Sequence, residues 1–192
     1  MTDDVVRYQL DPFYAECRAF GLLAEKMKDD ILAVRCHGYA FLPEALERRI
    51  HRDFGIKDWN RHEKDEGQKL RAILKDYIVF NSVCGRKKLS KMRENIIKLN
   101  ELGIYNMDIR EDNYRGGRLF DFSLAITSPH ISLSLRLRSK KNIEEDMRCD
   151  IEYFKELEAR EKKRRLEEET SEQARGMRRQ LRRRESRTLK YN

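Results

Sequence analysis

Residues 104–123 read IYNMDIREDNYRGGRLFDFS, and this stretch decides the expected fold. Asp108 precedes Asn113 by five positions, and Asp121 opens an Asp-Phe-Ser triplet. The Gly-Gly pair between them lies between short apolar runs, which predicts a β-hairpin because glycine tolerates the positive φ of tight turns. Such a hairpin would bring Asp121 back beside Asn113, so that two carboxylates and one amide gather in one cluster of loops.

The stretch resembles the catalytic region of protein kinases, in which an Asp, an Asn five residues later, a hairpin and a second Asp follow in this order. The resemblance implies that Asp108 accepts the proton of an attacking hydroxyl and that Arg110 contacts phosphate. It assigns Asn113 and Asp121 to magnesium held on nucleotide phosphates. Each residue also has a common structural interpretation, because Asp-Phe is a frequent dipeptide and a Gly-Gly pair is often only a turn.

The length of 192 residues suits one domain with an appendage. Charged residues make up 40% of the chain and the mean hydropathy is -0.86, so the chain is too polar to form one uniformly compact globule. The net charge of +8 lies mostly in residues 175–192, which contain eight Arg or Lys and one Glu. The tail is therefore basic and the body is close to neutral.

Cysteine and histidine spacing argues against a metal centre. The four cysteines form no C-x-x-C pair, and the four histidines show no ligand spacing with them. With no signal peptide ahead of them, the cysteines are expected to be reduced thiols of an intracellular protein. No apolar run approaches the roughly 20 residues of a membrane span, so no membrane partner is expected.

An α+β body is expected over residues 11–135, after a flexible lead at 1–10. Asp11-Pro12 predicts the start of a helix over 12–26, because Asp caps helix N-termini and Pro suits the first turn. The elements expected next are a strand at 31–42, an insert at 43–60 anchored by Trp59, a polar loop at 61–69, and a second strand at 72–80 that pairs antiparallel with the first.

The second half of the body is expected to begin with an amphipathic helix at 89–102, stopped by Gly103. The loop with Asp108 follows directly. Residues 124–130 would start an activation-type segment, and 131–138, ISLSLRLR, read as a short strand.

Residues 136–192 are predicted to form a long charged helical extension with a basic tail at 175–192. Its apolar stripe, at helical spacing, is enough to dock a helix on the body or on a partner, and it consists of Ile143, Met147, Ile151, Phe154 and Leu157. Beyond Leu157 the stripe thins and charged blocks favour a solvated helix with i,i+4 ion pairs. The helix has too few apolar residues for a strong homodimeric coiled coil.

Several segments resemble a fungal inner-kinetochore subunit family, the Fta-two type of the Sim-four complex. They are DPFYAECRAFG, AVRCHGYAFL, ILKDYI and LGIYNMDIREDNYRGGRLFDFS, all within residues 11–135. The resemblance implies a reduced protein-kinase-like core, a small antiparallel sheet plus helices, with the long charged C-terminal helix as an addition. It also implies other protein subunits as partners and a nuclear location at the kinetochore, with a cytoplasmic location left open.

Departures from the kinase pattern argue against catalysis. Asn106 stands where kinases usually have His, and Ser123 replaces the Gly after Asp-Phe, which restricts the backbone there. Glu16 is the positional candidate for the helix glutamate that pairs with the nucleotide lysine, but no Gly-rich loop and no Val-Ala-Ile-Lys segment precede it. Lys75 lies in the wrong strand for that lysine and is predicted to be an edge or hinge residue.

Three functions are consistent with these features. The first is a kinase-like, catalytically inactive protein-interaction subunit that needs no cofactor. The second is an active phosphotransferase of reduced kinase fold, which would use magnesium and ATP. The third is a chromatin or nucleic-acid anchor, in which phosphate is bound by Arg178, Arg179, Arg182, Arg183 and Arg184. An import signal or a solvated helix end would explain the same basic tail.

Overall fold

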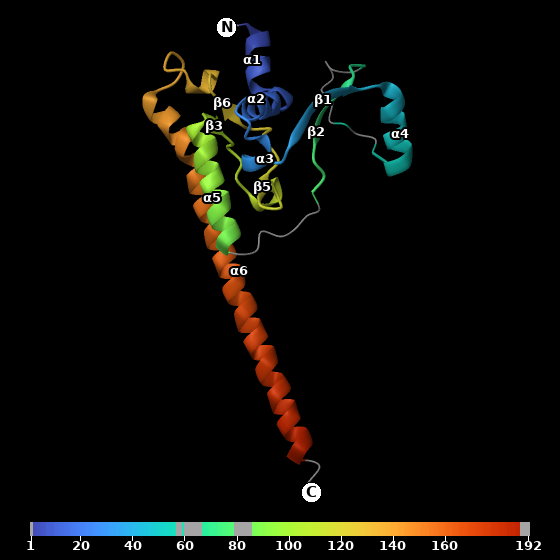
Figure 1. Ribbon diagram of the computed structural model, residues 1–192, viewed down its shortest axis with the longest axis vertical. Coiled ribbons are helices and arrows are strands. Elements are labelled where there is room, and N and C mark those ends of the chain that lie inside the picture. The colour runs from blue at the N-terminus through green and yellow to red at the C-terminus, as the bar shows by residue number, and fades with distance from the viewer. Residues whose placement is uncertain (1, 57–58, 60–66, 79–85, 189–192) are drawn as a thin grey trace.

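The computed structural model describes residues 2–56, 59, 67–78 and 86–188. The fold is α+β, with small antiparallel sheets and a long C-terminal helix (Figure 1). Its elements are α1 (Asp3–Leu10), α2 (Pro12–Glu25), α3 (Asp29–Leu32), β1 (Cys36–Leu42), α4 (Glu44–Phe54), β2 (Leu70–Lys75), α5 (Arg86–Glu101), β3 (Ile104–Tyr105), β4 (Tyr114–Arg115), β5 (Arg118–Leu119), β6 (Ile126–Thr127) and α6 (Lys140–Thr188).

Helix α2 begins as the sequence predicts. The Asp11 side chain accepts the backbone N–H of Phe13 at 2.9 Å, and Pro12 occupies the first helical position. The buried face of the helix then supplies part of the core, through Ala15, Ala19, Phe20 and Leu23.

The expected flexible lead is wrong, because residues 3–10 form α1. Arg18 of α2 donates to the carbonyl oxygens of Tyr8 at 2.5 Å and Gln9 at 2.8 Å, which satisfies the open C-terminal end of α1. The Tyr8 ring also packs on Tyr14, with 4.7 Å between centroids. These tertiary contacts hold a segment whose own sequence is polar.

The first sheet joins β1 and β2 antiparallel, as predicted, with a register shift between Cys36 and Gly38. The predicted strand at 31–42 began too early, because α3 occupies Asp29–Leu32, where two Asp residues suit a helix N-terminus. The predicted strand at 72–80 is in fact Leu70–Lys75, and its residues 79–80 lie outside the described residues, as does most of the loop at 61–69. The insert at 43–60 contains α4, a helix that was not predicted from the sequence.

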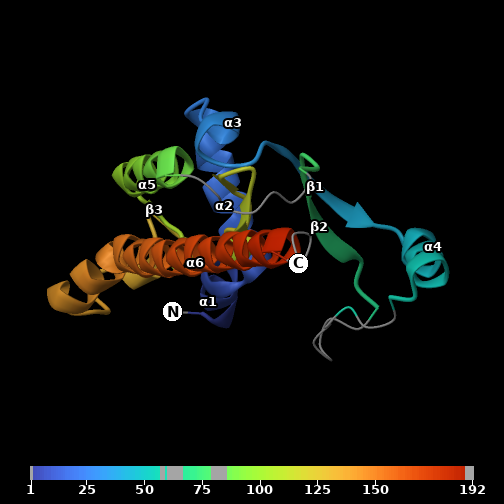
Figure 2. The same cartoon turned by 90° about the horizontal axis from the view of Figure 1, so that it is seen from below.

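Helix α5 and the first half of α6 lie side by side and cover the loop region (Figures 1 and 2). Gly103 ends α5 with a φ of 79°, a conformation that favours glycine. The core gathers side chains from α2, α5, the hairpin and α6, with Leu23, Met92, Phe122 and Phe154 among its fully buried members.

Residues 131–138 form no strand, contrary to the prediction. A short 3-10 helix spans Ile131–Leu133, and the His130 side chain accepts the backbone N–H of Ser132 at 3.1 Å, which turns the chain. Local capping therefore overrides the alternating apolar pattern.

Helix α6 contains 49 residues and is roughly 74 Å long at 1.5 Å per residue. Its first half docks on the body through Ile143, Phe154 and Leu157, with Ile151 partly buried, which confirms the predicted docking stripe except at Met147, whose side chain is exposed. Its second half extends away from the body (Figure 1). No helix in the described residues has both the length and the apolar character that crossing a membrane requires.

Candidate functional site

The loop between β3 and β4 brings Asp108 and Asn113 into direct contact. The side-chain amide of Asn113 donates to the backbone oxygen of Asp108 at 2.9 Å and to its carboxylate at 2.8 Å. Asn113 is buried, and its backbone N–H donates to the carbonyl of Arg110 at 3.1 Å. Arg110 in turn lies 3.1 Å from the Asp108 carboxylate and is largely exposed. The Asp108 carboxylate therefore meets two donors from its own loop.

The hairpin returns the chain to this loop, as the sequence predicts. Gly116 and Gly117 have φ values of 60° and 80°, and β4 pairs with β5 across them. The backbone N–H of Phe120 then donates to the carbonyl of Asn113 at 3.0 Å. Asp121 follows at once, and its carboxylate accepts the backbone N–H of Ser123 at 2.8 Å.

Asn106 links the two halves of the site. Its side-chain oxygen accepts the backbone N–H of Asp108 at 3.1 Å, and its amide donates to the carbonyl of Asp121 at 2.6 Å. Asn106 is fully buried, so both groups need these partners. The structure thus gathers Asp108, Asn113 and Asp121 in one hydrogen-bonded network.

Lys75, the last residue of β2, reaches this network, and its pairing with Glu16 was not predicted. Its Nζ forms an ion pair with the carboxylate of Glu16 and donates to the carbonyl of Phe120 at 2.6 Å. The side chains of Glu16 and Lys75 are only 13% and 17% exposed. Lys75 also lies 5.0 Å from the ring centroid of Phe20. The sequence contained a signal for this position. Lys75 lies four residues after Arg71, so both side chains are on the same face of β2, the face that meets α2.

Burial raises the pKa of the Glu16 carboxyl above its ordinary value. The neighbouring Asp121 carboxylate raises that pKa further, while the Lys75 ammonium opposes both effects. Glu16, Lys75 and Asp121 therefore form one interacting group contributed by α2, β2 and the segment after the hairpin.

Asp150 of α6 is a site residue that was not predicted from the sequence. Its buried carboxylate accepts the backbone N–H groups of Asn106 at 2.7 Å and Met107 at 2.8 Å. Met107 has a φ of 65°, which is unusual for a residue with a side chain. Burial raises the pKa of Asp150, and the two backbone donors oppose this rise. The sequence feature that could have indicated this role is the position of Asp150. It is a charged residue three positions after Met147 and four before Phe154, within the docking stripe.

Hard oxygen ligands are present but few. The described residues contain no group of three or more His, Cys, Asp and Glu side chains arranged to hold a metal ion. Asn113 and Asp121 each offer a side-chain oxygen, and magnesium usually takes only one or two carboxylates and completes its shell with water and substrate phosphates. The residues therefore fit a magnesium ion that arrives with a nucleotide better than a metal site formed by protein alone.

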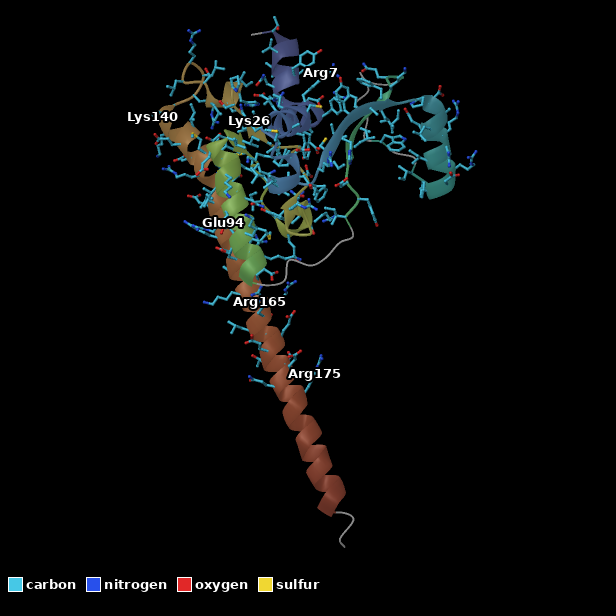
Figure 3. All side chains as sticks on the ribbon, in the orientation of Figure 1. Arg7, Lys26, Glu94, Lys140, Arg165 and Arg175 are labelled. Atoms are coloured by element: carbon cyan, nitrogen blue, oxygen red, sulfur yellow. The ribbon has the colours of Figure 1, made fainter. Side chains whose placement is uncertain are left out.

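The side chains of the tail arginines lie outside the described part of the structure: Arg178, Arg179, Arg182, Arg183 and Arg184. The α6 backbone continues through these positions, and Figure 3 shows Arg165 where the body ends and Arg175 on the helix beyond it.

Residues 2–126 match the model of a family described as kinetochore Sim4 complex subunit FTA2. This match covers the body from α1 to the start of β6 and includes every member of the network except Asp150. Neither the curated proteins nor the solved structures include a match to this chain.

Proposed function

The chain belongs to the family of the kinetochore Sim4 complex subunit FTA2, and we propose that it is a protein-binding subunit of a nuclear kinetochore assembly. Its body derives from a protein-kinase catalytic region whose residues now hold the fold and transfer no phosphate. Other protein subunits are its partners.

The projecting half of α6, residues 166–188, is the observation that carries this proposal. Packing ends near Arg164, which lies 3.7 Å from Glu111, and the described side chains from Leu166 to Gln173 are all exposed. An isolated helix of this length is marginal in water, and most helices in proteins are stabilised by tertiary packing. A partner protein along this half would supply the packing that the body does not.

The hydrogen bonds of the site support a structural role for the former catalytic loop. Both hydrogens of the Asn113 amide serve Asp108, and Arg110 pairs with the Asp108 carboxylate. Catalysis of phosphoryl transfer depends almost entirely on positioning and electrostatic stabilisation. A loop whose polar groups satisfy one another stabilises the fold, and it has few groups left to position a nucleotide.

Deletion of residues 166–192 tests the proposal. The deleted protein is expected to keep the melting temperature of the full chain, because the described side chains from Leu166 to Gln173 are all exposed. It is expected to lose co-purification with the other kinetochore subunits and to lose centromeric fluorescence of a tagged copy. A matched control replaces 166–192 with an unrelated soluble helix of equal length. Undiminished co-purification after the deletion would overturn the proposal.

Magnesium-dependent nucleotide binding, with phosphotransferase activity, is the second candidate. The ion pair of Lys75 and Glu16 beside Asp121 favours it, because kinases place a Lys–Glu pair at the nucleotide phosphates beside a metal-binding Asp. Lys75 would bind phosphate, and Asn113 with Asp121 would hold the magnesium ion. A bound nucleotide would supply the remaining metal ligands and the transferable group.

A further inference from the structure

The strand β1 has one edge without a backbone partner in the described part of the chain. Its other edge pairs with β2, and the sheet contains these two strands alone among the described residues. Figure 2 shows no described element along the side of β1 that faces away from β2. Peptide groups on an unpaired edge are a template for the addition of another strand.

A row of aromatic rings runs from α1 across α2 to β1, on the face of the sheet that α2 packs against. Centroids are 4.7 Å apart for Tyr8 and Tyr14, 5.4 Å for Phe13 and Tyr14, 5.8 Å for Phe13 and Tyr39, and 5.9 Å for Tyr39 and Phe41. Tyr39 and Phe41 are 60% and 54% exposed. Contiguous exposed rings of this kind mark interaction surfaces, and Tyr is enriched among residues that dominate binding energy.

The edge lacks most of the features that keep a strand unpaired. β1 reads CHGYAFL, with no Asp, Glu, Lys, Arg or Pro, and its bulge lies at the first end, near Gly38. When two identical strands pair antiparallel, residues of the same strand face one another, so a charged residue in β1 would meet like charge in the copy. The uncharged strand therefore suits pairing with its own copy.

Helix α2 packs on both strands of the sheet. The ion pairs Asp11–Arg71, at 2.9 Å, and Glu16–Lys75 join it to β2, and the ring contact of Phe13 with Tyr39 joins it to β1. In the register of the sheet, Tyr39 lies opposite Ile73 and Phe41 lies opposite Arg71, on the face that α2 packs against. The rings of β1 therefore stand beside α2 and remain more than half exposed.

A second copy fits beside this edge. If two β1 strands pair, the two β1–β2 pairs, each with α2 packed on both of its strands, are centred about two strand spacings apart, roughly 9–10 Å. Packed helices are about 8–10 Å apart, so the two α2 helices would come into packing contact. Tyr39 and Phe41 from both copies would lie at that contact.

We propose that β1 pairs antiparallel with β1 of a second copy of this chain. The product is a four-stranded sheet in the order β2-β1-β1-β2, closed by a two-fold axis, with Tyr39 and Phe41 of both copies between the helices. The pairing does not depend on whether the chain enters a kinetochore assembly.

Sedimentation equilibrium of the full chain tests the pairing. The wild type is expected to be a dimer at micromolar concentration. Tyr39→Lys and Phe41→Lys are each expected to raise the dissociation constant about tenfold or more, because a charged edge opposes strand pairing. Tyr77→Lys makes the same chemical change at a residue that is 91% exposed and outside the row, and it is expected to leave the dimer intact. A thermal melt of each variant checks that the body is folded.

Hydrogen exchange of the wild type locates the interface without any variant. Amides of β1 are expected to gain protection as the protein concentration rises, while those of α4 stay unchanged. A wild type that stays monomeric throughout the micromolar range would overturn the proposal. So would lysine variants that dimerise as tightly as wild type, or a dimer in which β1 amides exchange equally fast at every concentration.

Discussion

The Asp150 carboxylate on α6 accepts the backbone N–H of Asn106 at 2.7 Å, so the long helix fastens the loop that carries Asp108. The same carboxylate accepts the N–H of Met107, whose left-handed backbone needs external support. One side chain therefore couples the docking of α6 to the geometry of the candidate site.

Asp150→Asn is expected to destabilise the protein by about 1–3 kcal/mol, because an amide offers one oxygen and must turn its NH2 toward a donor. Chemical denaturation followed by circular dichroism measures this loss. Glu152→Gln, an exposed change on the same helix, is the control and is expected to be near neutral. Equal stability of the two variants would show that Asp150 does not hold the loop.

Asn113→Ala is expected to lower the free energy of unfolding by about 1–3 kcal/mol, since the backbone oxygen and the carboxylate of Asp108 lose the donor that the buried Asn113 amide provides. Binding to protein partners should persist once the variant is folded. Asn142→Ala removes an exposed amide from α6 and serves as the matched control. An unchanged melting curve for Asn113→Ala would argue against a structural role for the loop.

The magnesium and nucleotide candidate predicts a rise in melting temperature with ATP and magnesium together. Lys75→Ala and Asp121→Ala are expected to abolish this rise, because they remove the phosphate cation and a metal oxygen. Lys91→Ala removes an exposed lysine of α5 and is expected to preserve it. No rise in the wild type would exclude the nucleotide candidate and leave the protein-binding proposal standing.

His130 is expected to make stability depend on pH. Its Nδ1 accepts the N–H of Ser132 at 3.1 Å and its Nε2 lies 2.9 Å from the carbonyl of Gln9, so the folded chain needs the neutral ring. Burial lowers its pKa, and Arg18 lowers it further, while the bond to Gln9 opposes them. The unfolded chain therefore binds the proton more readily.

The stabilisation that the neutral His130 ring gives to the folded chain is fully present above the unfolded pKa of about 6.5. It is lost as the pH falls through the lower folded pKa. His130→Asn keeps an acceptor without a titrating group, and its stability should vary less between pH 7 and pH 5 than that of wild type. His51→Asn, at an exposed histidine, should retain the wild-type slope of stability against pH. Parallel slopes for all three proteins would contradict this assignment.

Local signals made much of the fold predictable. The Asp11 cap, the apolar face of α5, the Gly-Gly hairpin and the docking stripe of α6 each depend on neighbours in sequence. α1 was missed because Arg18 stabilises it from another helix. A contact between two different helices cannot be inferred from the local sequence pattern of either one.

The site was predictable in part for the same reason. Asp108, Asn113 and Asp121 share one short stretch, so their spacing indicated a common cluster. Lys75 and Asp150 reach that cluster from β2 and α6, and only the packing of these elements reveals their roles. Comparison with kinases also misdirected the interpretation of Lys75, because it placed the lysine on a strand before the glutamate.

The basic tail remains a proposed nucleic-acid anchor, and it makes a prediction about salt. Residues 175–192 hold seven Arg and one Lys against one Glu, and Arg binds phosphate through a bidentate, permanently charged fork. With about five phosphates contacted, the slope of log K against log salt on duplex DNA is expected to be about −4 to −5, because each contact releases counterion. Little sequence preference is expected, since phosphate contacts do not read bases.

Deletion of residues 175–192 should abolish this binding and leave the melting temperature of the body nearly unchanged, because packing on the body ends near Arg164. A matched control replaces the five arginines at 178, 179, 182, 183 and 184 with glutamine, which keeps the length and the helix propensity while it removes the charge. Fluorescence anisotropy with a labelled duplex across a salt series measures both variants. If the deleted protein bound DNA with the wild-type slope, the phosphate contacts would lie on the body, and the tail would serve as an import signal or a solvated helix end.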